Sequence, residues 1–138
     1  MYFKTISVIG LGYIGLPTAA IFASKGKSVA GVDVSEKAVQ TINRGEIHIV
    51  EPGLANVVSQ AVTKGFLRAA TKPEPADAFL VAVPTPFREG HQPDLSYIES
   101  ASKLIAPVLK KGDLVVLEST SPVGTTEQMS EWLAEARP

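Results

Sequence analysis

Hydrophobic positions in this chain form short apolar runs separated by stretches of helical spacing. Runs rich in β-branched residues and without polar alternation are typical of strands buried on both faces. The runs predict five strands, at 5–10, 28–33, 66–71, 77–84 and 113–120. Helical spacing, with glycine or serine at its boundaries, predicts helices at about 13–25, 35–44, 54–64, 95–107 and from 125 onward. Strands that alternate with helices predict a doubly wound α/β domain with a mainly parallel, Rossmann-like sheet.

Several helix boundaries carry their own signals. Ser35 is placed to cap the second helix, and Thr125 with Gln128 forms a capping box for the last one. Pro107 is expected to kink the end of the fourth helix. Trp132 falls on the amphipathic last helix, where we expect it to pack rather than to form a site. Ligands of such folds bind at the carboxyl ends of the strands, so the loops there are the candidate sites.

Composition narrows the function classes. The chain has 138 residues, of which 45% are hydrophobic, enough for one domain with a core. Thirteen basic and fourteen acidic residues, without a basic block, argue against nucleic-acid binding. There is no cysteine, which excludes disulfides and thiol nucleophiles. With only His48 and His91 and no ligand spacing, no metal site is expected.

Residues 5–24 carry no charge, which raises the question of a membrane span or a signal peptide. A lipid-crossing helix needs about 20 steadily apolar residues. This segment instead contains three glycines, a proline, two threonines and two serines. The basic leader and cleavage site of a signal peptide are only weakly imitated. We therefore expect no membrane association and a cytoplasmic protein.

Three glycines stand where the first strand meets the first helix. Gly10 permits a tight turn, Gly12 permits a pyrophosphate to approach the backbone, and Gly15 permits close packing. The helix N-terminus that follows favours an anion. Asp33 ends the second strand 18 residues beyond Gly15, where its carboxylate can bind the ribose hydroxyls of adenosine and repel a 2′-phosphate. The pattern predicts NAD binding; a glycine turn that serves packing alone is the alternative.

Four ordered segments, "ISVIGLGYIGLPTA", "VDVSEKAVQTINRGEIHIVEPGL", "FLVAVPTPF" and "VLESTSPVGTTE", resemble the UDP-glucose/GDP-mannose 6-dehydrogenase family over nearly the whole chain. The segments "INRGEIHIVEPGL" and "VAVPTPF" together are most similar to family members that act on UDP-N-acetyl-D-mannosamine. The resemblance implies oxidation of the sugar 6-hydroxymethyl group to a carboxylate with two NAD and one water. The implied product, UDP-N-acetyl-D-mannosaminuronate, serves bacterial surface polysaccharide synthesis.

Family members use a cysteine thiolate that carries the substrate as a thiohemiacetal and then as a thioester. That cysteine, together with a lysine, an asparagine and a glutamate, lies beyond the region that these 138 residues resemble. We therefore expect residues 1–138 to be the NAD-binding domain of a longer enzyme, whose central helix and carboxy-terminal UDP-sugar domain are not in this chain. Such a domain should bind NAD without completing the oxidation. Full-length relatives are commonly dimers through that helix, so we expect this chain to be a monomer or to self-associate weakly.

The resemblance also implies site residues. Tyr13 and Ile14 join the three glycines and Asp33 at the cofactor, as do Pro84, Thr85, Ser119 and Thr120. Thr120 is in addition the implied active-site threonine, which would position the catalytic water and the reacting centre. A rigid connector at 83–86 and an ordinary strand-to-helix turn at 118–124 are the alternatives.

Position 38 departs from the family pattern, and Glu51 has a structural interpretation. Several relatives place an arginine five residues after the acid, where this chain has Ala38, and Lys37 is the nearest replacement. Glu51 most simply begins a helix, where its charge meets the positive end of the helix dipole.

Two further functions remain open. A β-hydroxyacid dehydrogenase has a similar glycine turn, although Asp33 and "ESTSPVG" argue against it. A non-enzymatic NAD-sensing module would also have this fold, and fold alone does not separate it from an enzyme.

Overall fold

Five parallel strands form one sheet at the centre of the molecule. A computed structural model describes residues 4–12, 14–48, 52–83, 96–109, 113–117 and 125–136. Within these ranges the strands lie in the order β3-β2-β1-β4-β5, and every neighbouring pair is parallel. Their bounds are β1 Thr5–Ile9, β2 Ser28–Val32, β3 Leu67–Ala70, β4 Ala78–Val81 and β5 Leu114–Leu117.

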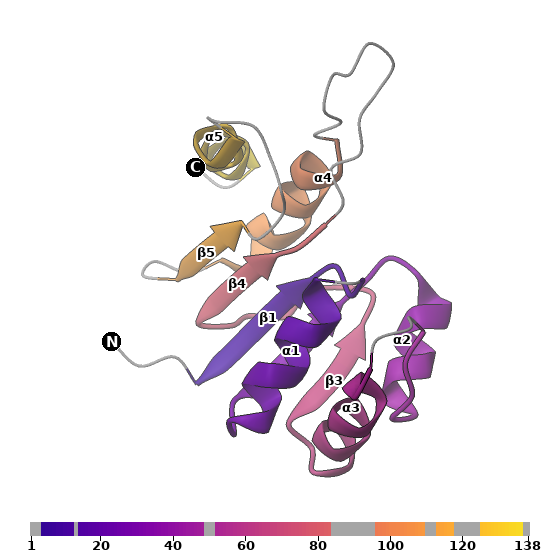
Figure 1. Cartoon of the computed structure of the whole chain (residues 1–138). Helices are drawn as coiled ribbons and strands as arrows, with labels where there is room; N and C mark the ends of the chain where they lie inside the picture. Colours follow the sequence, from indigo (N-terminus) through magenta and orange to yellow (C-terminus); the bar gives the residue numbers. More distant parts are fainter. Residues whose placement is uncertain are drawn as a thin grey trace.

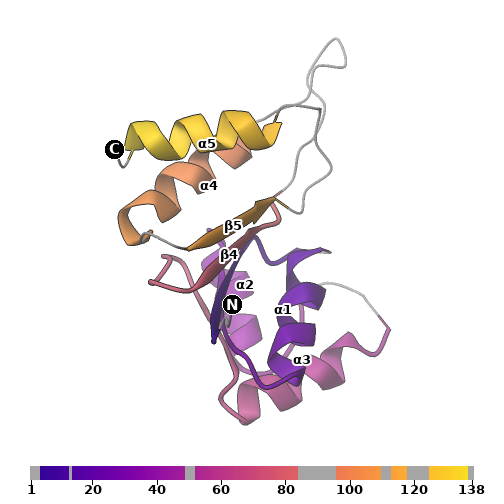
Figure 2. The ribbon, with the colours of Figure 1, turned by 90° about the vertical axis from the view of Figure 1, so that its left-hand side faces the viewer.

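Helices cover both faces of this sheet, so the domain is doubly wound as the sequence predicts. Figures 1 and 2 show α1, α2 and α3 on one side and α4 and α5 on the other. The helical bounds are α1 Gly15–Ser24, α2 Glu36–Asn43, α3 Leu54–Thr63, α4 Ser96–Ile105, the 3₁₀ turn η2 Ala106–Val108, and α5 Thr125–Ala136. None of the helices in the described ranges has the length and apolarity required to cross a membrane.

Each face of the sheet has its own hydrophobic cluster, because successive strand side chains point to opposite faces. Ile6 and Val8 of β1 belong to the cluster under α1, α2 and α3. Ile9 belongs to the cluster under α4, together with Phe79 of β4. Trp132 is half-buried and packs against this second cluster, in agreement with the packing role predicted for it.

The predicted elements all exist, with shifted ends. The predicted strands extend one or more residues too far where described, and α1 begins at Gly15 rather than at residue 13. Ser35 caps α2, since its Oγ accepts the backbone N–H of Ala38 at 3.2 Å. Pro107 lies in the 3₁₀ turn that ends α4, and α5 already includes Thr125, which the capping box predicts just before the helix. The strand order reverses between β1 and β4, and such a switch point opens a crevice at the carboxyl ends of the strands.

Candidate functional site

The turn after β1 requires glycine at two positions. Gly10 has a φ of +94°, and its N–H donates to the carbonyl oxygen of Val32 at 2.7 Å. A Cβ at Gly10 would lie 2.7 Å from the carbonyl oxygen of Ala82, the residue that follows β4. A Cβ at Gly15 would lie only 1.6 Å from the carbonyl oxygen of Gly10. Gly10 thus forms the tight turn and Gly15 the close packing that the sequence pattern predicts, and a side chain at Gly10 would also clash.

Gly12 differs from its two neighbours. A Cβ there would have no described atom within 4 Å, so packing within the described part of the chain does not require this glycine. Gly12 and Ile14 instead line a pocket of about 660 Å³ at the switch point. Ile14, the N-cap residue of α1, makes no side-chain capping bond, and the first turn has no acidic residue. The positive end of the helix dipole is therefore not neutralised by a capping side chain.

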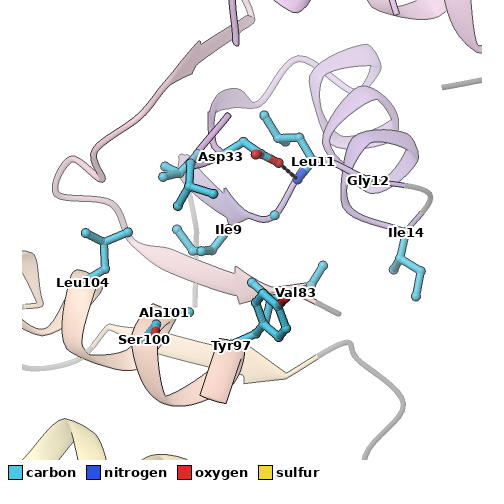
Figure 3. A pocket seen from close by; sticks show the side chains of 14 residues that line it. Ile9, Leu11, Gly12, Ile14, Asp33, Val83, Tyr97, Ser100, Ala101 and Leu104 are labelled. Atoms are coloured by element: carbon cyan, nitrogen blue, oxygen red, sulfur yellow. Dashed lines mark hydrogen bonds between the residues drawn. The ribbon is translucent and has the colours of Figure 1, made fainter. Parts of the chain in front are cut away.

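Asp33 connects the end of β2 to the glycine turn. Its Oδ2 accepts the backbone N–H of Leu11 at 3.0 Å, and its Oδ1 accepts the N–H of Ser35 at 2.9 Å. The first of these bonds is drawn in Figure 3. Because a carboxylate has about four lone-pair sites, Asp33 can still accept further hydrogen bonds. The side chain is half-buried and lines the same pocket.

Leu11 and Gly31 form a close contact that supports this turn. Leu11 is fully buried, and a Cβ at Gly31 would lie 2.8 Å from its Cδ2. The sequence analysis does not single out either residue. A glycine inside a strand is the signal that could have found the contact, because it often marks the close approach of another group.

The wall opposite Asp33 comes from β4 and α4, as Figure 3 shows. The pocket is lined there by Ala82, Val83, Tyr97, Ser100, Ala101 and Leu104. The sequence analysis predicts this helix but not that one of its faces lines a pocket. Tyr97 and Leu104, two large side chains seven residues apart that are not among the buried residues of α4, were the available signal.

The candidate cofactor residues that the structure describes lie close together. Gly10, Gly12, Ile14 and Asp33 line one pocket, and Gly15 lies directly behind it. Tyr13, Pro84, Thr85, Ser119 and Thr120, and also Glu51 and His91, lie outside the described residues.

Neither Ala38 nor Lys37, the nearest replacement for the family arginine, lines the pocket. Ala38 is buried. Among the described residues, no group of three or more acidic or histidine side chains could hold a metal ion.

This chain is similar in sequence to a family of nucleotide-sugar dehydrogenases. The model of the UDP-glucose/GDP-mannose dehydrogenase family, NAD binding domain, matches residues 4–138. A UDP-N-acetyl-D-mannosamine dehydrogenase of Yersinia pestis is 72% identical over 138 residues, which are 100% of this chain and 33% of the relative. An NDP-N-acetyl-D-galactosaminuronic acid dehydrogenase of Ralstonia nicotianae is 68% identical over 136 residues, 99% of this chain and 32% of the relative. The chain thus spans about a third of the length of these relatives.

A solved structure shows the same architecture. The UDP-D-ManNAc dehydrogenase of Pyrococcus horikoshii superposes with a TM-score of 0.91 at 40% sequence identity. The superposition covers 97% of this chain and 33% of that one.

Proposed function

Because the chain belongs to the UDP-glucose/GDP-mannose dehydrogenase family, as its NAD-binding domain, we propose that it supplies the cofactor site of a UDP-N-acetyl-D-mannosamine 6-dehydrogenase. The reaction would convert a sugar CH₂OH to a carboxylate, with one water and two NAD that leave as NADH. NAD supplies the hydride acceptor of this chemistry when bound. A relative that is 72% identical to this chain is named UDP-N-acetyl-D-mannosamine dehydrogenase.

The observation that carries the proposal is one pocket shared by Gly12, Ile14 and Asp33. Its volume, about 660 Å³, is within the range of about 300–1,000 Å³ that is usual for ligand sites. The residues present fit a dinucleotide: open space at Gly12 for a pyrophosphate, an α1 N-terminus without a side-chain cap, and a carboxylate at the end of β2. We assign the pyrophosphate to the first two and the adenosine ribose to Asp33.

We further propose that these residues are the amino-terminal domain of a longer enzyme. The support is that the matched relatives are about three times as long. Relatives named for different sugars are 72% and 68% identical to this chain, so this third of the sequence does not separate the substrates. We therefore assign the choice of sugar to the remainder of the enzyme. A full-length homodimer, a monomeric isolated domain and a cytoplasmic location remain predictions.

Within this proposal, Tyr13, Pro84, Thr85, Ser119 and Thr120 complete the cofactor site by resemblance to the family. Thr120 would also position water at the reacting centre. The catalytic thiolate must come from outside these 138 residues, because they contain no cysteine.

Calorimetric titration with NAD and with NADP tests the cofactor assignment. The Asp33 carboxylate would repel the 2′-phosphate of NADP. Two unit charges of the same sign about 6 Å apart repel by about 2.8 kcal/mol at an effective dielectric constant of about 20. After screening at a half-exposed site, we expect NADP to bind about 10- to 100-fold more weakly than NAD. Equal affinities for the two dinucleotides, or no binding of NAD, would contradict the assignment.

A turnover assay tests the domain assignment. The 138-residue protein with NAD and UDP-N-acetyl-D-mannosamine should produce no NADH. Steady NADH production by this chain alone would refute the assignment of the thiolate to another part of the enzyme.

A further inference from the structure

Gly31 is a buried glycine inside β2, with β1 on one side and β3 on the other. It is paired with Val8 of β1 and with Ala69 of β3. Glycine is unfavourable inside a strand, because it loses more conformational freedom on folding than any other residue. Its φ is not positive, so the backbone conformation does not require glycine here. The reason for this glycine is therefore sought in the space where a side chain would stand.

The Leu11 side chain occupies that space. A Cβ at Gly31 would lie 2.8 Å from Leu11 Cδ2, 2.9 Å from its Cδ1 and 3.3 Å from its Cγ. Carbon atoms in contact usually lie about 3.5–4.0 Å apart, so one methyl group at position 31 would displace Leu11 by about 0.7 Å or more. Leu11 is fully buried in the hydrophobic cluster under α1, α2 and α3. Because such a core is close-packed, the displacement must also move the backbone of Leu11.

The backbone of Leu11 belongs to the glycine turn, which is joined to three successive residues at the end of β2. The Gly10 N–H donates to the carbonyl oxygen of Val32 at 2.7 Å. The Leu11 N–H donates to Oδ2 of Asp33 at 3.0 Å. The Leu11 side chain makes the third connection, to Gly31. Figure 3 shows that this side chain points away from α4, so its packing fixes from behind the backbone that faces the pocket.

We propose that Leu11 and Gly31 form a matched large and small pair that positions the cofactor site. The missing side chain at Gly31 lets Leu11 pack close to the sheet. The depth of Leu11 then sets where its N–H meets the Asp33 carboxylate, and where Gly12 stands for the pyrophosphate. Gly31 does not line the pocket, so it is a positioning residue that acts through Leu11. The inference rests on the proposed NAD function and deepens it.

The first experiment is calorimetric titration of the 138-residue protein and of its Gly31→Ala variant with NAD. We expect the dissociation constant of the variant to be about tenfold higher, because a misplacement of about 1 Å at a functional site can cost up to about a hundredfold. A folded Gly31→Ala variant that binds NAD as tightly as the wild type overturns the proposal.

An exchange of the large and the small side chain tests whether the effect passes through Leu11. The Leu11→Ala variant leaves the space over Gly31 empty, and we expect it to bind NAD about tenfold more weakly. Adding Gly31→Val returns a branched side chain to that space, and exchanges that conserve volume are tolerated best. The double variant should therefore bind NAD at least about threefold more tightly than Leu11→Ala alone. A smaller recovery overturns the matched pair.

Ala61→Val is the matched control for a loss of stability without a change in the turn. Ala61 lies on α3, is 4% exposed, belongs to the same hydrophobic cluster as Leu11 and does not line the pocket. Added bulk there should lower the Tm and leave the NAD dissociation constant unchanged. A purely structural role for Gly31 would give this same result. Equal losses of NAD affinity in Ala61→Val and Gly31→Ala overturn the positioning role.

The outcomes separate this inference from the proposed function. A wild-type protein that does not bind NAD overturns both. A wild-type protein that binds NAD, with Gly31→Ala and Leu11→Ala variants of unchanged affinity, overturns the pair and leaves the NAD site standing. Circular dichroism of each variant checks that the fold is retained. If Gly31→Ala does not fold, the comparison of Leu11→Ala with and without Gly31→Val decides.

Discussion

Replacing Asp33 by asparagine tests a role for this side chain that does not depend on the cofactor. In the structure its two oxygens accept two backbone N–H groups, of Leu11 at 3.0 Å and of Ser35 at 2.9 Å. An asparagine of the same shape has one acceptor oxygen, and its NH₂ group would face the other N–H. The carboxylate therefore fixes the glycine turn and the start of α2 relative to each other before any ligand arrives.

The loss can be estimated from these contacts. A hydrogen bond to a charged group contributes about 1.5–3 kcal/mol, and Asp33→Asn removes at least one. With an unfolding entropy of about 2.1 cal/mol/K per residue, 138 residues give about 0.29 kcal/mol per degree. We expect the Tm of the ligand-free protein to fall by about 5–10 °C. Thermal unfolding followed by circular dichroism measures this fall directly.

A matched control separates the loss of the Asp33 hydrogen bonds from the loss of one negative charge. Glu46→Gln also converts an acid to an amide, at a side chain 63% exposed and 3.7 Å from Arg44. An exposed ion pair of this kind contributes about 0–1 kcal/mol, so its Tm should change little. If Asp33→Asn loses NAD affinity but keeps the wild-type Tm, the carboxylate does not brace the turn and the reasoning is refuted.

Four further changes have outcomes set by local geometry. Gly15→Ala should cost more than about 3 kcal/mol of unfolding free energy or prevent folding, because its Cβ overlaps a carbonyl oxygen. The Gly12→Ala variant should fold normally and bind NAD at least tenfold more weakly. Denaturant unfolding compares its stability with that of the Gly15→Ala variant, and calorimetry measures its affinity for NAD. Equal stabilities of these two variants would contradict the account. Ser7→Ala should hold or raise stability by up to about 1.5 kcal/mol, because the buried Ser7 hydroxyl has no hydrogen-bond partner in the described structure; a loss above about 1 kcal/mol in denaturant would show a hidden partner. Asn43→Ala should cost about 1–3 kcal/mol, since its side-chain amide makes two 2.9 Å bonds to the backbone of β3; Gln40→Ala on the exposed side of the same helix is the control, and equal losses would argue against the contact.

Much of the fold could be predicted because its signals are local. β1 is a run without charged residues whose last four residues are all buried, which is typical of a strand covered on both faces. Ser35 caps α2 through the Ala38 amide only three residues away, so the capping signal is visible in the sequence. Strand ends were less certain, because the last residue of each run also has to fit the turn that follows it, as Gly10 does with its φ of +94°.

The candidate site was predicted less completely. Gly12 and Asp33 were found because the spacing between a glycine turn and an acid at the next strand end follows from one βαβ unit. The brace from Asp33 to Leu11 was not predicted, since it joins residues 22 apart across two neighbouring strand ends. The bonds from Asn43 to Ala69 join residues 26 apart for the same reason. Backbone groups give no signal in the sequence for such partners.

The sequence by itself determined which segments are strands and helices, the turn at Gly10, Gly12 and Gly15, and the acid that faces it. Those features depend on backbone preferences and on spacing within one short segment. Only the tertiary structure decided that α4 lies across from Asp33 and that Ser100 and Leu104 line a pocket with Val34. That arrangement requires β4 to pair with β1, a choice made by packing between segments about 70 residues apart in the sequence.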